Sequence, residues 1–218
     1  MSKMVWDQDG ERLYKTGVEQ AAIFPMTKGV YGTGEAWNGL TAVNISPEGA
    51  EPTPLYANNK KYAELVSNEE IKGSIEAYMY PDGFAACLGE VEIAEGVTIA
   101  QQARSPFGLV YKSLIGSDAE GTKHGYELTI IYNARASVSE TANSTINESP
   151  EVDPMSWEFS TTPTAVEGYE PTSKITFNST KVDAEKLAQL EAMIYGSESE
   201  EPKLPSPAEI ITLMSAAG

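Results

Sequence analysis

The stretch that decides the fold runs from Phe107 to Pro163 and has the sequence FGLVYKSLIGSDAEGTKHGYELTIIYNARASVSETANSTINESPEVDPMSWEFSTTP. Inside it, residues 124–136 carry apolar side chains on both faces, with one face formed by Tyr126, Leu128, Ile130 and Tyr132 and the other by Ile131. A segment that is apolar on both faces is typical of a central strand packed on both sides. We therefore predict a long central strand here.

A second strand is predicted after a polar loop in the same stretch. Residues 144–151 are polar and contain Pro150, which favours a loop. Residues 155–161 then place Trp157 and Phe159 on one face and Glu158 and Ser160 on the other. The order strand, long polar loop, strand follows from this pattern.

The clearest alternation outside this stretch lies between Asn68 and Tyr80. One face carries Ile71, Gly73, Ile75, Ala77 and Met79, and the other carries Glu70, Lys72, Ser74, Glu76 and Tyr78. This period of two predicts a strand with one buried and one wet face. Further strands are expected at residues 18–25, 40–46 and 174–179. The fold class we expect is mainly β with flanking helices (α+β), an antiparallel β-sandwich or barrel.

Residues 47–63 are expected to form a long loop. Pro47, Gly49, Pro52 and Pro54 argue against regular structure there, and long ordered loops are usually functional. We therefore expect this segment to contact a neighbouring subunit.

Three helices are predicted from capping signals. Pro81 starts a short turn that Gly89 ends, and Asp183 caps a helix bearing Leu187, Leu190 and Ile194 that Gly196 ends. Residues 196–205 read as an acidic, flexible linker. Ser206 and Glu209 then form a capping box for a helix at 206–218, whose apolar face carries Ile210, Ile211, Leu213 and Met214. This helix can dock on its own body or on a neighbour.

Composition excludes several classes of function. The 218-residue chain has a net charge of −17, which argues against nucleic-acid binding and by itself indicates a solubilising surface. Cys87, the only cysteine, sits in an apolar context and rules out an intrachain disulfide, and His124 is the only histidine. Asp82 and Glu90 lack a third group that would complete an active site. We expect no cofactor, no metal, and neither a membrane span nor a signal peptide.

An ordered set of short motifs runs along most of the chain. It comprises the segments at 46–50, 56–59, 76–87, 107–163, 179–183 and 204–211. In this order the set resembles the major tail proteins, or tail-tube proteins, of long-tailed bacteriophages that infect Gram-positive bacteria. The N-terminal segment, residues 1–16, matches this family least well.

The resemblance implies a non-enzymatic, architectural role. It implies a tail-tube β-sandwich domain at residues 1–195, hexameric rings stacked into a tube, and linear DNA passing through the lumen without specific binding. The expected partners are further copies of the chain and the tail tape-measure, tail-terminator and tail-tip proteins, in a virion tail assembled in the host cytoplasm. On this interpretation the negative charge belongs to a wall that repels DNA.

The resemblance also implies roles for particular residues. Glu70 and Glu76 face the lumen if the strand at 68–80 lines it, and the alternative is that this polar face points outward. The candidate contacts between subunits are Tyr56, Asn58, Tyr62, Ile210, Ile211, Leu213 and Met214.

Two other classes of function compete with this interpretation. A carbohydrate-binding or adhesin-type β-sandwich would use Trp6, Trp37 and Trp157 as stacking platforms, although the alternation around Trp157 favours a core position. A hydrolase is the third class, but one histidine and scattered acids supply no signature.

Overall fold

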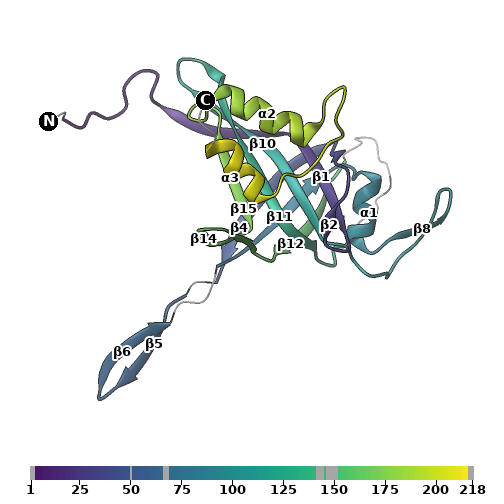
Figure 1. The fold of residues 1–218 in the computed structure, drawn as a ribbon, viewed down its shortest axis with the longest axis horizontal. Coiled ribbons are helices and arrows are strands. Elements are labelled where there is room, and N and C mark those ends of the chain that lie inside the picture. Colours follow the sequence, from purple (N-terminus) through teal and green to yellow (C-terminus); the bar gives the residue numbers. More distant parts are fainter. Residues whose placement is uncertain (1–2, 50, 66–68, 141–144, 146–151, 216–218) are drawn as a thin grey trace.

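The computed structural model describes residues 3–49, 51–65, 69–140, 145 and 152–215. The protein is mainly β (Figure 1). The strands of the main sheet are β1 (Leu13–Thr27), β2 (Val30–Tyr31), β3 (Glu35–Ala36), β4 (Leu40–Glu48), β7 (Glu70–Ala77), β10 (Phe107–Ser117), β11 (Gly121–Ala136), β12 (Met155–Thr161) and β15 (Lys174–Asn178). Three separate hairpins are β5 (Thr53–Ala57) with β6 (Lys60–Leu65), β8 (Val91–Ala94) with β9 (Val97–Ile99), and β13 (Thr164–Val166) with β14 (Tyr169–Thr172). The helices are α1 (Asp82–Leu88), α2 (Ala184–Tyr195) and α3 (Pro207–Ser215).

The main sheet is antiparallel, with the order β2-β1-β10-β11-β12-β7-β4, and β15 and β3 pair with β11 and β1. This confirms a mainly β, antiparallel fold with flanking helices. The sheet is a single curled sheet and does not close into the barrel that was one of the two expected forms. Irregular register on both sides of Glu19, together with positive φ angles at Gly17 and Gln20, bends β1. Such bulges increase local twist and curl a sheet.

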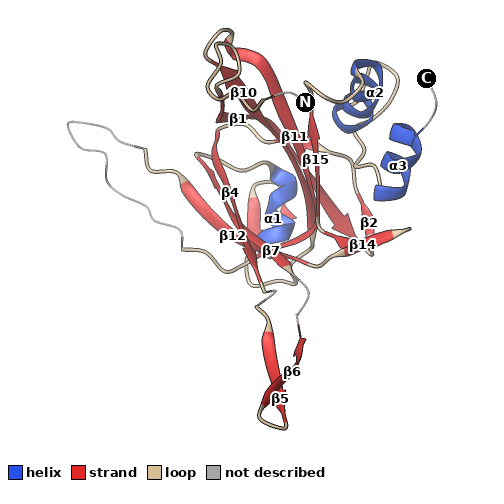
Figure 2. Cartoon of the chain, turned by 90° about the vertical axis from the view of Figure 1, so that its left-hand side faces the viewer, coloured by secondary structure: helices blue, strands red, loops and turns tan. Residues whose placement is uncertain are grey.

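One core lies inside the curl of the sheet. It contains Trp37, Phe84, Phe107, Trp157 and Phe159, whose ring centroids lie 4.6 to 6.4 Å apart in tilted and edge-on pairs. Helix α1 supplies Phe84 and packs on this side of the sheet (Figure 2). These contacts tie β10, β12 and α1 together, as expected for edge-to-face aromatic packing.

A second core lies on the opposite face of the sheet, beneath α2 and α3. It contains Leu128, Ile130 and Tyr132 from β11 together with Leu187, Leu190 and Ile194 from α2. Because both faces of β11 are covered, its residues from Leu128 to Tyr132 are all buried. The prediction of a central strand packed on both sides is confirmed.

The alternation predicted around residues 70–77 is confirmed, with Ile75 and Ala77 buried in the inner core. The strand ends at Ala77, however, and Met79 is 63% exposed. The N–H of Tyr78 still donates to the carbonyl of Gly39, just before β4 begins, and the chain then reaches Pro81, the N-cap of α1. The predicted burial of Met79 is therefore wrong. The polar loop expected at 144–151 lies, except for residue 145, outside the described residues.

The linker prediction at 196–205 needs correction, because its second half is docked on the body. The N–H of Lys203 donates to the Met193 carbonyl, the hydroxyl of Tyr132 donates to Pro205 (2.9 Å), and Leu204 is buried. The apolar and hydrogen-bonded residues after Glu201 make this segment a strap that leads directly into α3.

The predicted capping box of α3 is present and reciprocal. The side chain of Glu209 accepts from the N–H of Ser206 at 2.7 Å, and the Ser206 hydroxyl accepts from the N–H of Glu209 at 3.3 Å. Helix α3 docks on its own body: Ile210 enters the second core, and Lys186 of α2 donates to the carbonyl of Met214. Residues 216–218 lie outside the described residues.

Acidification is expected to release α3 from the body. The hydrogen bond from Lys203, followed by that from the Ser206 N–H, lowers the pKa of Glu209 from 4.5 to about 2. A carboxylate with a lowered pKa stabilises the fold above its unfolded pKa, and this stability is lost as the pH falls from 4.5 towards 2. Amide hydrogen exchange of residues 207–215, corrected for intrinsic rates, should accelerate between pH 6 and pH 3.

Two variants provide the comparison. Glu209→Gln should exchange quickly already at pH 6 and respond less to acid, whereas Glu198→Gln, at an exposed position, should behave as the parent protein. An unchanged pH response in Glu209→Gln would refute the assignment.

Candidate assembly surfaces

The outer face of β4, β7 and β12 is polar and slightly acidic. Glu70 is exposed and Glu76 is half-buried on this face, where the Asn44 amide donates to Glu76 at 3.4 Å. The register also places Glu48 opposite Glu70 and Lys72 opposite Ser160. The structure therefore brings Glu70 and Glu76 onto one surface, as the alternation predicted.

Neighbouring carboxylates stabilise the protonated, positively charged form of Lys72 on this face. Its ammonium group pairs with Glu48, which raises the pKa of Lys72, and Glu70 and Glu158 act in the same direction. Arg135, opposite Ser160, is a second cation on the face. The face is acidic because its carboxylates outnumber its cations: Glu48, Glu70, Glu76 and Glu158 against Lys72 and Arg135.

The segment at 47–63, expected to be a loop, contains regular structure. Pro47 extends β4 opposite Ile71. Proline lacks a backbone N–H, and an edge strand tolerates proline where that N–H would point outward and bond no neighbouring strand. Residues 53–65 then form the β5–β6 hairpin, turned by Asn58 and Asn59 with φ of 50° and 62°. Asparagine tolerates this left-handed conformation better than most residues. The expectation that prolines would prevent strands here is wrong.

The β5–β6 hairpin projects from the body (Figure 1). Tyr56 is 71% and Tyr62 78% exposed, and Asn58 is exposed at the turn. Lys60 and Lys61 follow that turn, and Lys61 pairs with Glu64 at 2.7 Å. Three predicted contact residues thus lie on one accessible, basic and aromatic tip.

The four C-terminal candidates occupy a different place. Ile210 is only 3% exposed and belongs to the second core, against which Leu213 and Met214 also pack, and Ile211 is half-buried. In this structure the apolar face of α3 is used largely within its own chain. It is separate from the β5–β6 hairpin (Figure 1).

The β8–β9 hairpin was not predicted from the sequence. Its four large apolar residues, Val91, Ile93, Val97 and Ile99, are 40 to 60% exposed. The alternation on either side of Glu95-Gly96 is the signal that would have found it, since a glycine turn between alternating segments predicts a hairpin. Gly96 has a φ of 73°, which favours glycine at this position.

Cys87 and His124 lie in different surroundings, Cys87 in the core and His124 partly exposed. Cys87 is buried, and desolvation raises the pKa of its thiol to about 12, so it is mostly protonated at neutral pH. His124 faces Glu120 at 2.8 Å. Among the described residues, no group of three or more His, Cys, Asp or Glu side chains could hold a metal ion.

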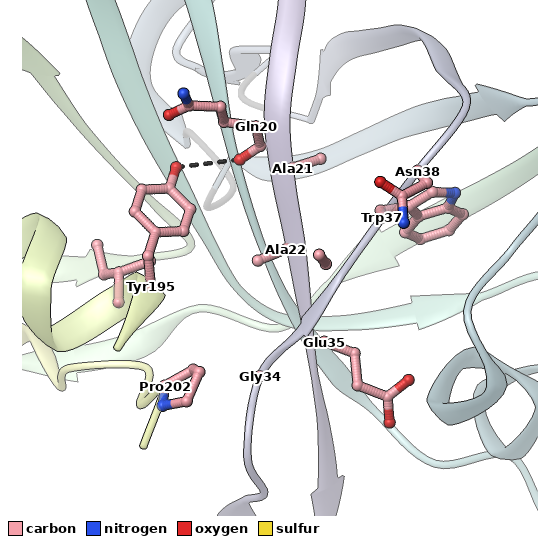
Figure 3. A pocket seen from close by; sticks show the side chains of 11 residues that line it. Gln20, Ala21, Ala22, Gly34, Glu35, Trp37, Asn38, Tyr195 and Pro202 are labelled. Atoms are coloured by element: carbon pink, nitrogen blue, oxygen red, sulfur yellow. Dashed lines mark hydrogen bonds between the residues drawn. The ribbon is translucent and has the colours of Figure 1, made fainter. Parts of the chain in front are cut away.

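A hollow of about 440 Å³ lies between β1, β3 and the end of α2 (Figure 3). The hydroxyl of Tyr195 donates to the carbonyl of Gln20 at 3.0 Å across it, and the carboxylate of Glu35 accepts from the N–H of Gly83. The other lining residues include Ala21, Ala22 and Pro202. The hollow shows no nucleophile with an adjacent base.

The three tryptophans are not a shared platform. Trp37 and Trp157 are each 4% exposed in the inner core, and Trp6 is 74% exposed on the N-terminal segment. The core position favoured for Trp157 is confirmed.

Comparison with known proteins does not identify a family. No protein-family model matches the chain, and no curated protein matches it. In the described parts of the chain, none of the helices is long and apolar enough to span a membrane.

Proposed function

We propose that this protein is a structural subunit of a bacteriophage tail tube, in which hexameric rings stack into a hollow conduit. The observation that carries the proposal is the pair of open edges on the curled sheet. Among the described residues, β4 pairs only with β7, and β1 from Leu13 to Glu19 pairs only with β10. Open edges template pairing with another chain, and closure into a ring removes them.

The acidic face of β4, β7 and β12 supports a lumen-lining role. Glu70 and Glu76 would face DNA and repel its phosphates, so that the genome passes without specific binding. Salt screens such repulsion beyond about 8 Å, so the carboxylates act on DNA only near the wall.

The projecting β5–β6 hairpin supports a contact between subunits. Tyr56 and Tyr62 expose large rings that lose little conformational entropy on binding. On this proposal the tube also meets tape-measure, tail-terminator and tail-tip proteins, and the protein resides in the virion tail. The role is mechanical and requires no catalysis or cofactor.

Negative-stain electron microscopy of the concentrated protein, checked by light scattering, tests this function. Rings or hollow tubes of uniform width are the expected result. Monodisperse monomers that bind a sugar saturably on a glycan array would instead support the alternative, a carbohydrate-binding or adhesin module. Of the three tryptophans that could serve such a module, Trp6 alone is exposed.

Charge reversal tests the lumen assignment. Tubes of Glu70→Lys/Glu76→Lys should retain short double-stranded DNA in a sedimentation assay at low salt, whereas parent tubes should not. Each added phosphate contact steepens the salt dependence of DNA binding. Glu198→Lys/Glu200→Lys, at exposed positions outside the sheet, is the control. Equal retention by both variants would contradict the assignment of Glu70 and Glu76 to the lumen.

A further inference from the structure

The chain reverses tightly between α2 and the strap that leads into α3. Shortly after the end of α2, the N–H of Lys203 donates back to the carbonyl of Met193. In between, the N–H of Ser197 donates to the carbonyl of Glu200 at 2.9 Å, and the Ser197 hydroxyl accepts from the N–H of Glu200 at 3.2 Å. Residues 196–201 are therefore folded into a compact turn, which we call the hinge.

The charge of the hinge opposes this compact form. Glu198, Glu200 and Glu201 are exposed, and residues 196–202 contain no lysine or arginine. Like charges on neighbouring residues repel, and charged linkers extend for this reason. Fully extended, the hinge would span about 20 Å. An extended hinge carries α3 away from its site on the same chain, because docking there requires the chain to turn back at once.

The strap and α3 cover a surface that needs an occupant. Leu204 is 4% and Ile210 3% exposed, and both belong to the second core. Leu204 lies so close to β10 that a Cβ atom at Gly108 would be 2.3 Å from its side chain. The buried hydroxyl of Tyr132 donates to the carbonyl of Pro205 at 2.9 Å. Loss of the strap and α3 would expose apolar area and leave this hydroxyl without its acceptor, and both changes destabilise the fold.

The other contacts that hold α3 are partly exposed. The side chains of the Lys203–Glu209 ion pair are 62% and 43% exposed, and such pairs stabilise weakly. Lys186 of α2 donates to the carbonyl of Met214 at 2.9 Å. Helix α3 has nine residues, lies beside α2 (Figure 2), and is too short to be stable alone in water. It needs a docking site, but its own chain holds it only through a hinge that favours extension.

We propose that the strap and α3 exchange between copies of this chain, so that α3 of one copy docks on α2 and β11 of another. The structure shows the occupant in place: the segment that fits this surface is the same in every copy, so exchange needs no new complementarity. Short hinges that are disfavoured in their folded form invite such exchange. The inference goes beyond the tail-tube function, since exchange joins copies whether or not they form rings.

Mixed single-cysteine proteins test exchange without requiring tubes. Lys186→Cys and Ser215→Cys proteins are mixed at high concentration, held at pH 3 to loosen α3, returned to neutral pH and treated with a short bis-maleimide. Lys186 reaches the carbonyl that precedes Ser215, so the two new thiols lie close together where α3 sits on α2. A covalent heterodimer should form in the mixture and stay at background in each protein alone, since Cys87 is buried.

Two controls fix the meaning of the result. A single chain with both Lys186→Cys and Ser215→Cys should cross-link within itself, which shows that the linker can bridge these positions. Lys186→Cys mixed with Tyr169→Cys, at an exposed position of the β13–β14 hairpin, should give only background. Background levels of heterodimer in the first mixture, with the proteins folded by circular dichroism, would overturn the proposal.

The hinge provides the matched comparison. Glu198→Gln/Glu200→Gln in both cysteine proteins should lower the heterodimer yield about threefold, because the folded hinge is then less repulsive. Glu167→Gln/Glu170→Gln, at exposed positions of the β13–β14 hairpin, should leave the yield unchanged. Insertion of a short glycine-serine segment after Ser199 should lower it, since a longer loop returns α3 to its own site at little entropic cost. A yield that neither hinge change lowers would refute the role of the hinge.

The outcomes keep exchange and the tail-tube function distinct. Heterodimers in protein that never forms rings or tubes would support exchange and count against the tube function. Tubes in which the heterodimer stays at background would support the tube function and overturn exchange.

Discussion

Replacement of Gly73 by alanine is expected to destabilise the fold by about 3 kcal/mol, the upper part of the usual range for overpacking a core. A Cβ atom at this position would lie 2.2 Å from the carbonyl oxygen of Asn44 and 2.6 Å from the ring of Phe159. The Asn44 oxygen belongs to the backbone of β4 and cannot rotate away. Gly73 thus lets β4 and β7 approach closely where the sheet curls over the inner core.

Urea denaturation followed by tryptophan fluorescence measures this effect, because Trp37 and Trp157 lie in the same core. Ser74→Ala, on the outer face of the same strand, is the control and should change stability by no more than about 0.5 kcal/mol. Similar unfolding midpoints for the two variants would show that β4 can move away at little cost.

The second large effect is expected at Lys112, whose side chain is only 8% exposed. Its ammonium group pairs with Glu191 of α2 at 2.9 Å and lies 4.3 Å from the centre of the Tyr126 ring. The hydroxyl of Tyr126 donates to the same carboxylate at 2.6 Å. Lys112→Ala removes the countercharge, and we expect a loss of about 2 to 3 kcal/mol, below the full cost for a buried pair because Glu191 is 22% exposed.

A double-mutant comparison separates the ion pair from packing. Lys112→Met/Glu191→Met should recover most of the stability lost in Lys112→Met, because a buried pair can often be replaced by apolar side chains of similar size. The measurement is the unfolding free energy of the four proteins. If the double variant is no more stable than Lys112→Met, the ion pair does not hold α2 on the sheet.

Elements with local signals were predicted well. The alternation in residues 70–77 and 155–161 has the two-residue period of a strand, and Asp183 and Ser206 satisfy N–H groups within three residues of themselves. Such signals depend on neighbours in the sequence and need no knowledge of the fold. For the same reason, the spacing of Glu70 and Glu76 is enough to put both residues on one face of a strand.

Elements whose conformation depends on distant contacts were predicted poorly. Proline content suggested a loop at 47–63, but pairing with β7 keeps Pro47 in a strand at the edge of the sheet. Acidic residues suggested a flexible linker at 196–205, but contacts with Tyr132 and Met193 dock its second half. In both cases partners far along the chain outweigh the local preference.

The sequence by itself determined the mainly β class, the caps of α2 and α3, the alternating faces of β7 and β12 and the acidic surface, because each follows from residue type and short-range spacing. Only the tertiary structure decided the close approach of β4 and β7 at Gly73, the pairing of Lys112 with Glu191 and the projection of the β5–β6 hairpin from the body. These features join residues 29 or more positions apart or expose hairpins whose neighbours in space are not their neighbours in sequence. No local period records such contacts, since they arise when the sheet folds over its core.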